Sequence, residues 1–272
     1  MRENIRMQPL LVLLCFSLLS CSVKEDRGEC PVYININFDE VIRKDLFRKS
    51  LVCVQSSSAF SSDNLELLDY EGIGYDVSAS RGVVRLSAAF GHQACSFRSD
   101  TLLVQEGAEI GKLFVWSDVE MCENDLYCVS ARPHKQYCTM NVIVCGEFPW
   151  QDAEFDMRLR ANCNSFRMFD MEPLEGNYTA LLERRNASGY EIRLPRQKVS
   201  DVIIELLEKN GSGLYTDSDL IGVVDVGREL AAKGYDWDKE DLDDVYVTVD
   251  FTRCSASIDI VPWNPETIDI QI

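Results

Sequence analysis

The chain has 272 residues, with 27 lysines and arginines against 45 aspartates and glutamates, and its formal net charge at pH 7 is -18. A surface this acidic repels phosphate backbones, so we expect no nucleic-acid partner. The length is sufficient for two domains of about 120 residues each once a leader has been removed.

The first twenty residues have the features of a lipoprotein signal peptide. Arg2 and Arg6 precede an apolar run that is too short to span a bilayer of about 30 Å as a helix. The run ends in Leu18-Leu19-Ser20-Cys21, the spacing that a lipoprotein signal peptidase requires. We therefore predict that residues 1–20 are removed and that Cys21 carries lipid, such as palmitate. The alternative is an ordinary secretory signal that ends near a cysteine by chance.

Residues 21–29 are predicted to form a short charged tether. Its Lys24-Glu25-Asp26 is similar to the signal that sends lipoproteins of Bacteroidetes to the outer face of the outer membrane. We expect a lipid-anchored protein of the cell outer membrane, exposed on the cell surface. Alternatively, the charged stretch is only a soluble linker.

Apolar and polar residues begin to alternate after the tether, as they do in half-buried strands. The first predicted strand is VYININF, residues 32–38. Further strands are predicted at Leu51–Val54, Val83–Ala89, Thr101–Val104, Lys112–Trp116 and Tyr137–Cys145. Short strands between Ser, Gly and Asp clusters favour an antiparallel sandwich over an α/β fold. The break at Phe148–Asp152 is the predicted boundary between sandwich domains over residues 30–148 and 149–272.

The second half resumes the alternation and then changes its period. Its predicted strands are Phe155–Arg160, Ser165–Met168, Tyr178–Glu183, Tyr190–Leu194 and Val202–Leu207. Helical spacing follows at Leu220, Val223, Val224, Leu230 and Ala231, between capping residues Asp217–Asp219 and a terminating Gly234. The last strand candidates are VYVTVDF, ASIDIVPW and Thr267–Ile272. The predicted fold class is all-β, with a short helix in the second sandwich. Thr267–Ile272 pairs either in its own sheet or with a neighbouring chain.

Eleven cysteines are present, of which two belong to the signal peptide and the lipid site. The remaining number is odd, so at least one thiol stays free or pairs between chains. Disulfides such as Cys122 to Cys128 or Cys138 to Cys145 are compatible with an exported protein. Others, including Cys53 and Cys145, lie in apolar strand patterns that favour burial as small hydrophobes.

No motif for catalysis or for metal binding is visible. His92 and His134 are the two histidines, and we expect both in exposed loops because G-x-S-x-G and H-E-x-x-H are absent. A zinc site built from cysteines and His134 lacks CxxC pairs. The acidic run Asp236–Asp244 has carboxylates for calcium or a glycosidase pair, but no supporting frame, so we interpret it as a solvated connection. We predict no enzyme, no cofactor and no metal.

The order of several short motifs resembles the fimbrial anchor and assembly lipoproteins of Bacteroidetes, the FimB-type minor fimbrial anchor subunits. The motifs are the lipobox at Cys21, Asp26-Arg27, Cys30-Pro31, VYININF, MNVIVCGEF, DDVYVTVDF and IDIVPW. The resemblance implies two tandem transthyretin-like β-sandwiches, lipid on Cys21, and a non-catalytic role in holding a fimbrium and limiting its length. It also implies strand exchange with pilin subunits. The many cysteines are a departure from the family pattern.

Two other functions stay open. A surface module that binds glycan or host protein would use exposed aromatic side chains as a stacking surface, and the tryptophans are Trp116, Trp150, Trp237 and Trp263. Trp116 lies in an apolar strand, which favours core packing for that residue. A glycoside hydrolase would need paired carboxylates in a cleft.

Overall fold

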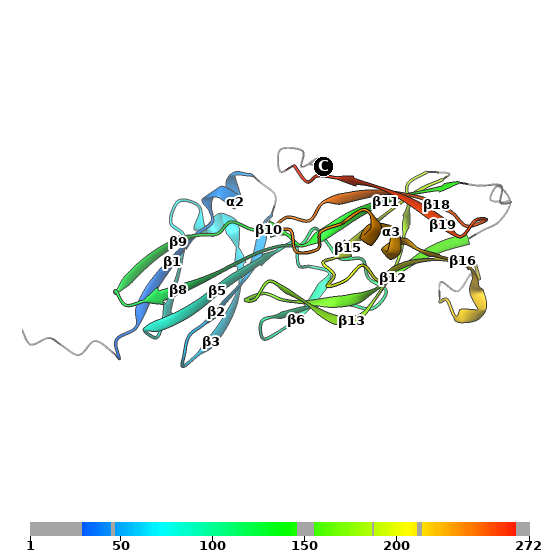
Figure 1. Ribbon diagram of the computed structural model, residues 1–272. Helices are drawn as coiled ribbons and strands as arrows, with labels where there is room; N and C mark the ends of the chain where they lie inside the picture. The colour runs from blue at the N-terminus through cyan, green and yellow to red at the C-terminus, as the bar shows by residue number, and fades with distance from the viewer. Residues whose placement is uncertain (1–28, 45–46, 146–154, 187, 211–213, 265–272) are drawn as a thin grey trace, which may run out of the picture. The chain divides into compact units, whose positions relative to one another are not determined.

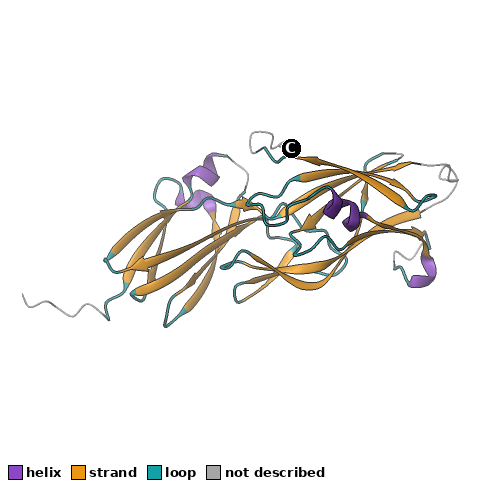
Figure 2. Ribbon diagram, viewed as in Figure 1, coloured by secondary structure: helices purple, strands orange, loops and turns teal. Residues whose placement is uncertain are grey.

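The computed structural model describes residues 29–44, 47–145, 155–186, 188–210 and 214–264, and those from residue 31 onward form one compact unit. Strands dominate the described chain, and its helices are short (Figure 1, Figure 2). None of the described helices is long and apolar enough to cross a membrane. The predicted all-β class with two sandwiches is confirmed.

The first sandwich consists of a three-stranded and a five-stranded sheet. In pairing order, the smaller sheet is β4 (Tyr75–Ala79), β1 (Val32–Asn37) and β9 (Leu126–Ser130). The larger sheet is β10 (His134–Lys135), β8 (Phe114–Cys122), β5 (Gly82–Phe90), β2 (Lys49–Gln55) and β3 (Phe60–Glu66). Helix α2 (Asp39–Arg43) and the 3₁₀ helix η1 (Leu67–Tyr70) lie in connections. β1 pairs parallel with β9, and the other pairs are antiparallel.

The second sandwich is also made of two sheets. One is β14 (Glu183–Arg184), β15 (Gly189–Pro195), β11 (Tyr137–Cys145), β18 (Asp244–Asp250) and β19 (Ser255–Val261). The other is β17 (Leu220–Asp225), β16 (Val202–Glu208), β12 (Phe155–Arg167), β7 (Thr101–Val104) and β6 (Cys95–Arg98), with β13 (Glu172–Leu181) also on β12. Helix α3 (Val226–Ala232) and the 3₁₀ helix η2 (Asp217–Asp219) complete it. β11 pairs parallel with β18.

The strands form where the alternation is regular. In β1, Val32, Ile34 and Ile36 are fully buried whereas Tyr33 is 53% exposed, which is the period of two that predicted this strand. β7 and β11 have the predicted bounds. The two strands predicted at Phe155–Arg160 and Ser165–Met168 are one long strand, β12, with irregular pairing near its middle.

Strand pairing crosses the predicted boundary at residues 148 and 149. β6, β7 and β11 precede that boundary in the chain, yet they pair with strands that follow it. The chain passes from β5 in the first sandwich to β6 in the second, returns at β8, and leaves again after β10. The division into domains at this boundary stays a prediction.

Only the second half of the segment predicted as a helix is helical. Residues Leu220–Asp225 form strand β17 and the helix α3 begins at Val226. β-branched side chains at Ile221 and Val223 favour the strand, and pairing with β16 satisfies its backbone. The Asp225 side chain accepts a hydrogen bond from the backbone N–H of Arg228 at 2.9 Å, so it is the N-cap. Gly234, with φ of 72°, follows the helix as predicted.

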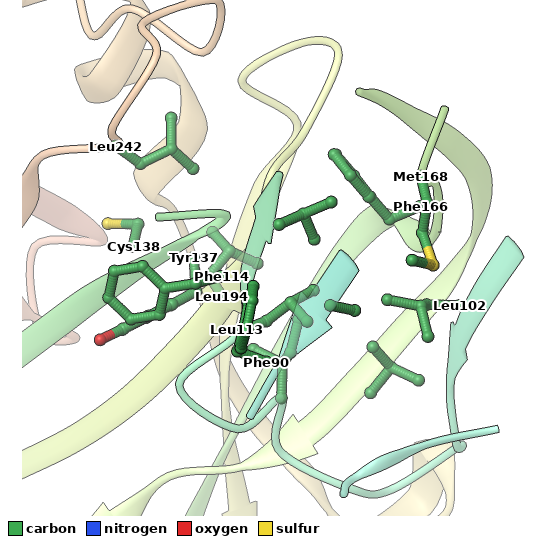
Figure 3. Packing of buried hydrophobic residues seen from close by; sticks show 14 of the residues in the cluster. Phe90, Leu102, Leu113, Phe114, Tyr137, Cys138, Phe166, Met168, Leu194 and Leu242 are labelled. Carbon is green, nitrogen blue, oxygen red and sulfur yellow. The ribbon is translucent and has the colours of Figure 1, made fainter. Parts of the chain in front are cut away.

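One continuous cluster of buried apolar side chains runs through the unit. Figure 3 shows a part of it, where Phe114 of β8 packs against Tyr137 of β11 with ring centres 5.8 Å apart. Phe90 of β5 lies against Phe38 at 6.1 Å. The core therefore links strands of the first sandwich to strands of the second.

Candidate functional site

Several of the predicted features lie outside the described residues. They are the signal peptide 1–20, the lipid site Cys21 with the tether up to residue 28, the boundary segment Phe148–Asp152 with Trp150, and the terminal segment Thr267–Ile272. Lipidation of Cys21 and strand pairing by the terminal segment stay predictions.

The acidic run is a braced loop rather than a solvated connection. It joins α3 to β18 as predicted, but Asp241 accepts a hydrogen bond from the backbone N–H of Lys135 at 2.6 Å. Asp244 accepts one from the backbone N–H of Thr139, also at 2.6 Å. Asp243 accepts one from the backbone N–H of Trp263 at 2.8 Å. The loop carboxylates thus satisfy main-chain donors in β10, near the start of β11 and after β19.

Lys135 provides the charge that holds this loop. Its side chain is fully buried, and its ammonium donates to Asp244 at 2.6 Å and to the carbonyl of Leu242 at 2.9 Å. The ammonium also lies 4.7 Å from the ring centres of both Tyr137 and Trp263. Aromatic faces attract a cation, and this attraction strengthens where water is excluded. The buried ammonium therefore has an anionic partner, a carbonyl acceptor and two aromatic faces around it.

Arg196, which follows β15, is the second cation beneath the loop. Its guanidinium donates to the side chain of Gln136 at 2.7 Å and to the carbonyls of Lys239 at 2.8 Å and Glu240 at 3.0 Å. It also donates to the carbonyl of Trp237. Burial lowers the pKa of Arg196 from its ordinary value, because desolvation disfavours the charged form. The fork of donors fixes the course of the loop.

A polar groove of about 720 Å³ opens between this loop and strands of the first sandwich. Its lining includes Asp118, Arg132, His134 and Arg196. His134 belongs to β10 and is half-buried, with Nε2 3.0 Å from Glu240 and Nδ1 3.4 Å from Asp241. The prediction of an exposed loop is therefore wrong for His134, because loop carboxylates pair with it.

Two of the three described tryptophans offer no exposed face for aromatic stacking. Trp116 and Trp237 are 5% and 6% exposed, which confirms core packing for Trp116. Trp263 is partly buried and covers the Lys135 ammonium. Among the described residues, no group of three metal-ligating side chains lies together. His92 is half-buried, and burial lowers its pKa.

The nine cysteines of the described chain are all free thiols, so the two suggested disulfides are not formed. Cys138 and Cys145 lie at opposite parts of β11, about 23 Å apart along the strand, whereas a disulfide needs Cα atoms about 6 Å apart. Cys122 is buried and Cys128 is exposed. Burial raises the pKa of Cys138 to about 12, so this thiol stays protonated at neutral pH. Cys145 is exposed, contrary to prediction.

β8 has an open edge. β5 pairs with β8 along its whole length, but β10 pairs only with Phe114 and Val115 on the other side. From Trp116 to Cys122, no described strand pairs with that side. Two main-chain groups there bind side chains instead. The N–H of Val119 donates to the carboxylate of Asp118 at 2.8 Å, and the carbonyl of Met121 accepts from the hydroxyl of Tyr127 at 3.1 Å.

The tip between β12 and β13 lies on the outer face of the larger first-sandwich sheet. Ser117 of β8 donates to the carbonyl of Phe169 at 2.8 Å, and the guanidinium of Arg85 lies 5.4 Å from the Phe169 ring. Arg85 also forms an ion pair with Asp170. This contact ties the long β12–β13 hairpin to β5 and β8.

The Arg85–Asp170 pair predicts a pH dependence of stability. The hydrogen bond from Arg85 lowers the pKa of Asp170, so its contribution is present above the ordinary aspartate value and is lost as the pH falls through the lowered one. In urea unfolding, Asp170→Asn is expected to lower the unfolding free energy at pH 7. The difference from the wild type is expected to shrink as the pH falls below about 3.9 and to vanish only below the lowered pKa of Asp170. Glu106→Gln, at an exposed loop carboxylate, is the control. A difference independent of pH would contradict this assignment.

Comparison with known proteins finds a likeness only at the level of structure, since no protein-family model and no curated protein sequence matches the chain. A candidate adhesin from Bacteroides ovatus has a TM-score of 0.55 at 9% identity, over 81% of this chain and 89% of that chain. A candidate polysaccharide-binding protein from Bacteroides thetaiotaomicron has a TM-score of 0.55 at 9% identity, over 88% and 99%. The fimbrial anchor protein Mfa2 from Porphyromonas gingivalis has a TM-score of 0.54 at 9% identity, over 86% and 98%. The chain thus shares its two-sandwich fold with a fimbrial anchor protein and with a candidate adhesin.

Proposed function

We propose that this protein is a non-catalytic surface lipoprotein that anchors a fimbrium to the outer membrane and regulates its assembly or length. The observation that carries the proposal is the fold shared with the fimbrial anchor protein Mfa2 over 86% of this chain. The lipobox that ends at Cys21 supports it independently, because lipid is a means of attachment to a membrane.

The tether would keep the first sandwich close to the membrane. Ten residues lie between Cys21 and Val32, the first residue of β1, and the eleven steps of an extended chain reach at most about 40 Å. Tension on a bound fimbrium would pass through backbone ladders, in which many hydrogen bonds bear the load together. Pilin subunits that add a strand to an open edge are the proposed partners.

The described polar side chains support a non-catalytic role. His134 is held by two carboxylates, and the acidic loop uses Asp241, Asp243 and Asp244 to bind main-chain donors. A catalytic base needs instead to reach a substrate proton. These groups are occupied in maintaining the fold.

The alternative is a surface lipoprotein that binds glycan or host protein. The polar groove of about 720 Å³ and the likeness to a candidate polysaccharide-binding protein favour it. The burial of Trp116 and Trp237 weighs against it, because sugar rings commonly stack on exposed aromatic faces.

The test is Cys21→Ala in the native host, with Cys30→Ala as the matched control at another cysteine close to the amino terminus. Cell fractionation, surface protease treatment and electron microscopy of fimbriae are the measurements. Release of the protein together with detached, longer fimbriae is expected. Release with unchanged fimbriae would favour the binding module, and retention on the membrane would contradict lipidation of Cys21.

A further inference from the structure

The open side of β8 presents main-chain groups in a defined pattern. In an antiparallel ladder, each residue directs its N–H and its carbonyl to the same neighbouring strand. The N–H of Val119 and the carbonyl of Met121 bind side chains rather than β5, so these residues face the open side. By the same alternation, so does Ser117. An incoming strand would meet these groups after displacing the side chains of Asp118 and Tyr127.

The side chains beside this edge have an unusual arrangement. Asp118 and Glu120 lie opposite Leu86 and Val84 of β5, and both of these partners are fully buried. Residues directly opposite each other share a face of the sheet, so the two carboxylates lie on the core-facing side at the margin of the sandwich. Charges that point inward at an edge discourage pairing with another copy of the same chain.

The other face of the same edge carries apolar side chains beside Arg85, which lies opposite Val119 and is paired with Asp170. Val119 and Met121 are 55% and 57% exposed, and Val83, opposite Met121, is 48% exposed. An incoming strand would therefore place alternate side chains against carboxylates on one face and against an apolar surface on the other.

We propose that the edge of β8 from Trp116 to Cys122 accepts an extended segment of a partner protein in which basic and apolar residues alternate. Basic side chains would pair with Asp118 and Glu120, and apolar ones would cover Val119 and Met121. The charge of Asp118 and Glu120 favours a basic partner segment over the other candidate strands. A second copy brings the same carboxylates, and the terminal segment Thr267–Ile272 contains an aspartate and no basic residue. This inference rests on the proposed function, because it assigns pilin binding to one edge.

Proline at position 119 is the sharpest probe of this edge. The Val119 N–H points away from β5, so Val119→Pro removes an edge donor and leaves the ladder with β5 complete. Two fluorescent peptides of equal length serve as ligands, one of alternating lysine and valine and the other of alternating glutamate and valine. The full mature chain is expected to prefer the lysine peptide at least tenfold, and Val119→Pro is expected to weaken that binding at least tenfold.

A charge variant provides the second test. Glu120→Lys leaves every main-chain group in place, and we expect it to weaken the lysine peptide at least tenfold while it strengthens the glutamate peptide. This variant decides the question if Val119→Pro does not fold. Asp236→Lys, at an exposed loop carboxylate, controls for the overall charge. Equal losses in the Glu120 and Asp236 variants, or unchanged binding to a folded Val119→Pro protein, would overturn the proposal.

The same variant in cells separates this inference from the proposed function. Lipidated Val119→Pro protein is expected to stay on the membrane while fimbriae detach. If fimbriae stay attached with Val119→Pro but are released by Cys21→Ala, the anchor function stands and the β8 edge is the wrong acceptor. If neither variant affects fimbriae, both proposals fail.

Discussion

Replacement of Asp244 by alanine is expected to lower the unfolding free energy by about 3–5 kcal/mol, the usual cost of removing one partner from a buried ion pair. The ammonium of Lys135 is fully buried and would keep the Leu242 carbonyl and two aromatic faces, but it would lose its anion. The backbone N–H of Thr139 would lose its acceptor as well. Urea unfolding at neutral pH is the measurement.

The matched variant is Lys135→Met, which replaces the cation by an apolar side chain of similar length. Asp244 is 25% exposed and retains the Thr139 N–H, so it can recover hydration, whereas the buried Leu242 carbonyl loses its donor. We therefore expect a loss of about 1–3 kcal/mol, smaller than that of Asp244→Ala. If Asp244→Ala and Lys135→Met lowered the unfolding free energy equally, the stabilisation would come from the attraction between the two charges. The cost of leaving the Lys135 ammonium buried without an anion would then not be the main cause.

Arg196→Met is expected to cost about 3 kcal/mol. The variant leaves the carbonyls of Trp237, Lys239 and Glu240 without their shared donor, and an unsatisfied buried acceptor costs about 1–3 kcal/mol. Water entering from the adjoining groove would recover part of the loss. The lost contacts belong to the loop, so amide hydrogen exchange should rise most between residues 235 and 243.

Arg132→Met is the control for this prediction, because Arg132 is exposed and lines the same groove. A change within about 0.5 kcal/mol is expected there. If Arg132→Met cost as much as Arg196→Met, the charge of the groove, and not the hydrogen bonds to the loop, would be responsible.

The regular strands could be predicted because their pattern is local. β1 alternates over its whole length, and β7 and β11 are compact, largely apolar runs bounded by polar or turn residues, so the sequence defines all three strands to within a residue. The helix prediction was wrong for Leu220–Asp225, because apolar residues three and four apart also occur in a short strand followed by a helix. In that case pairing with β16 decides the conformation, and a tertiary contact of this kind overrides local spacing.

The site could not be predicted because its partners are far apart in the sequence. Lys135 lies 109 residues before Asp244, and no local signal connects them. An isolated acidic run such as Asp236–Asp244 is equally typical of a solvated loop. The open edge of β8 is weakly indicated in the sequence. Asp118 and Glu120 occupy positions on the core-facing side of β8, where the other residues of the strand are buried.

The repeated passage of the chain between the sandwiches has a mechanical consequence. Connections from β5 to β6, from β7 to β8 and from β10 to β11 all join the same two bodies. A pull applied at opposite ends of such an arrangement is divided among three covalent links in parallel, whereas beads on a string transmit it through one. The protein would therefore resist separation of its two sandwiches under tension. A single proteolytic cut in one connection would leave the sandwiches covalently joined through the other two.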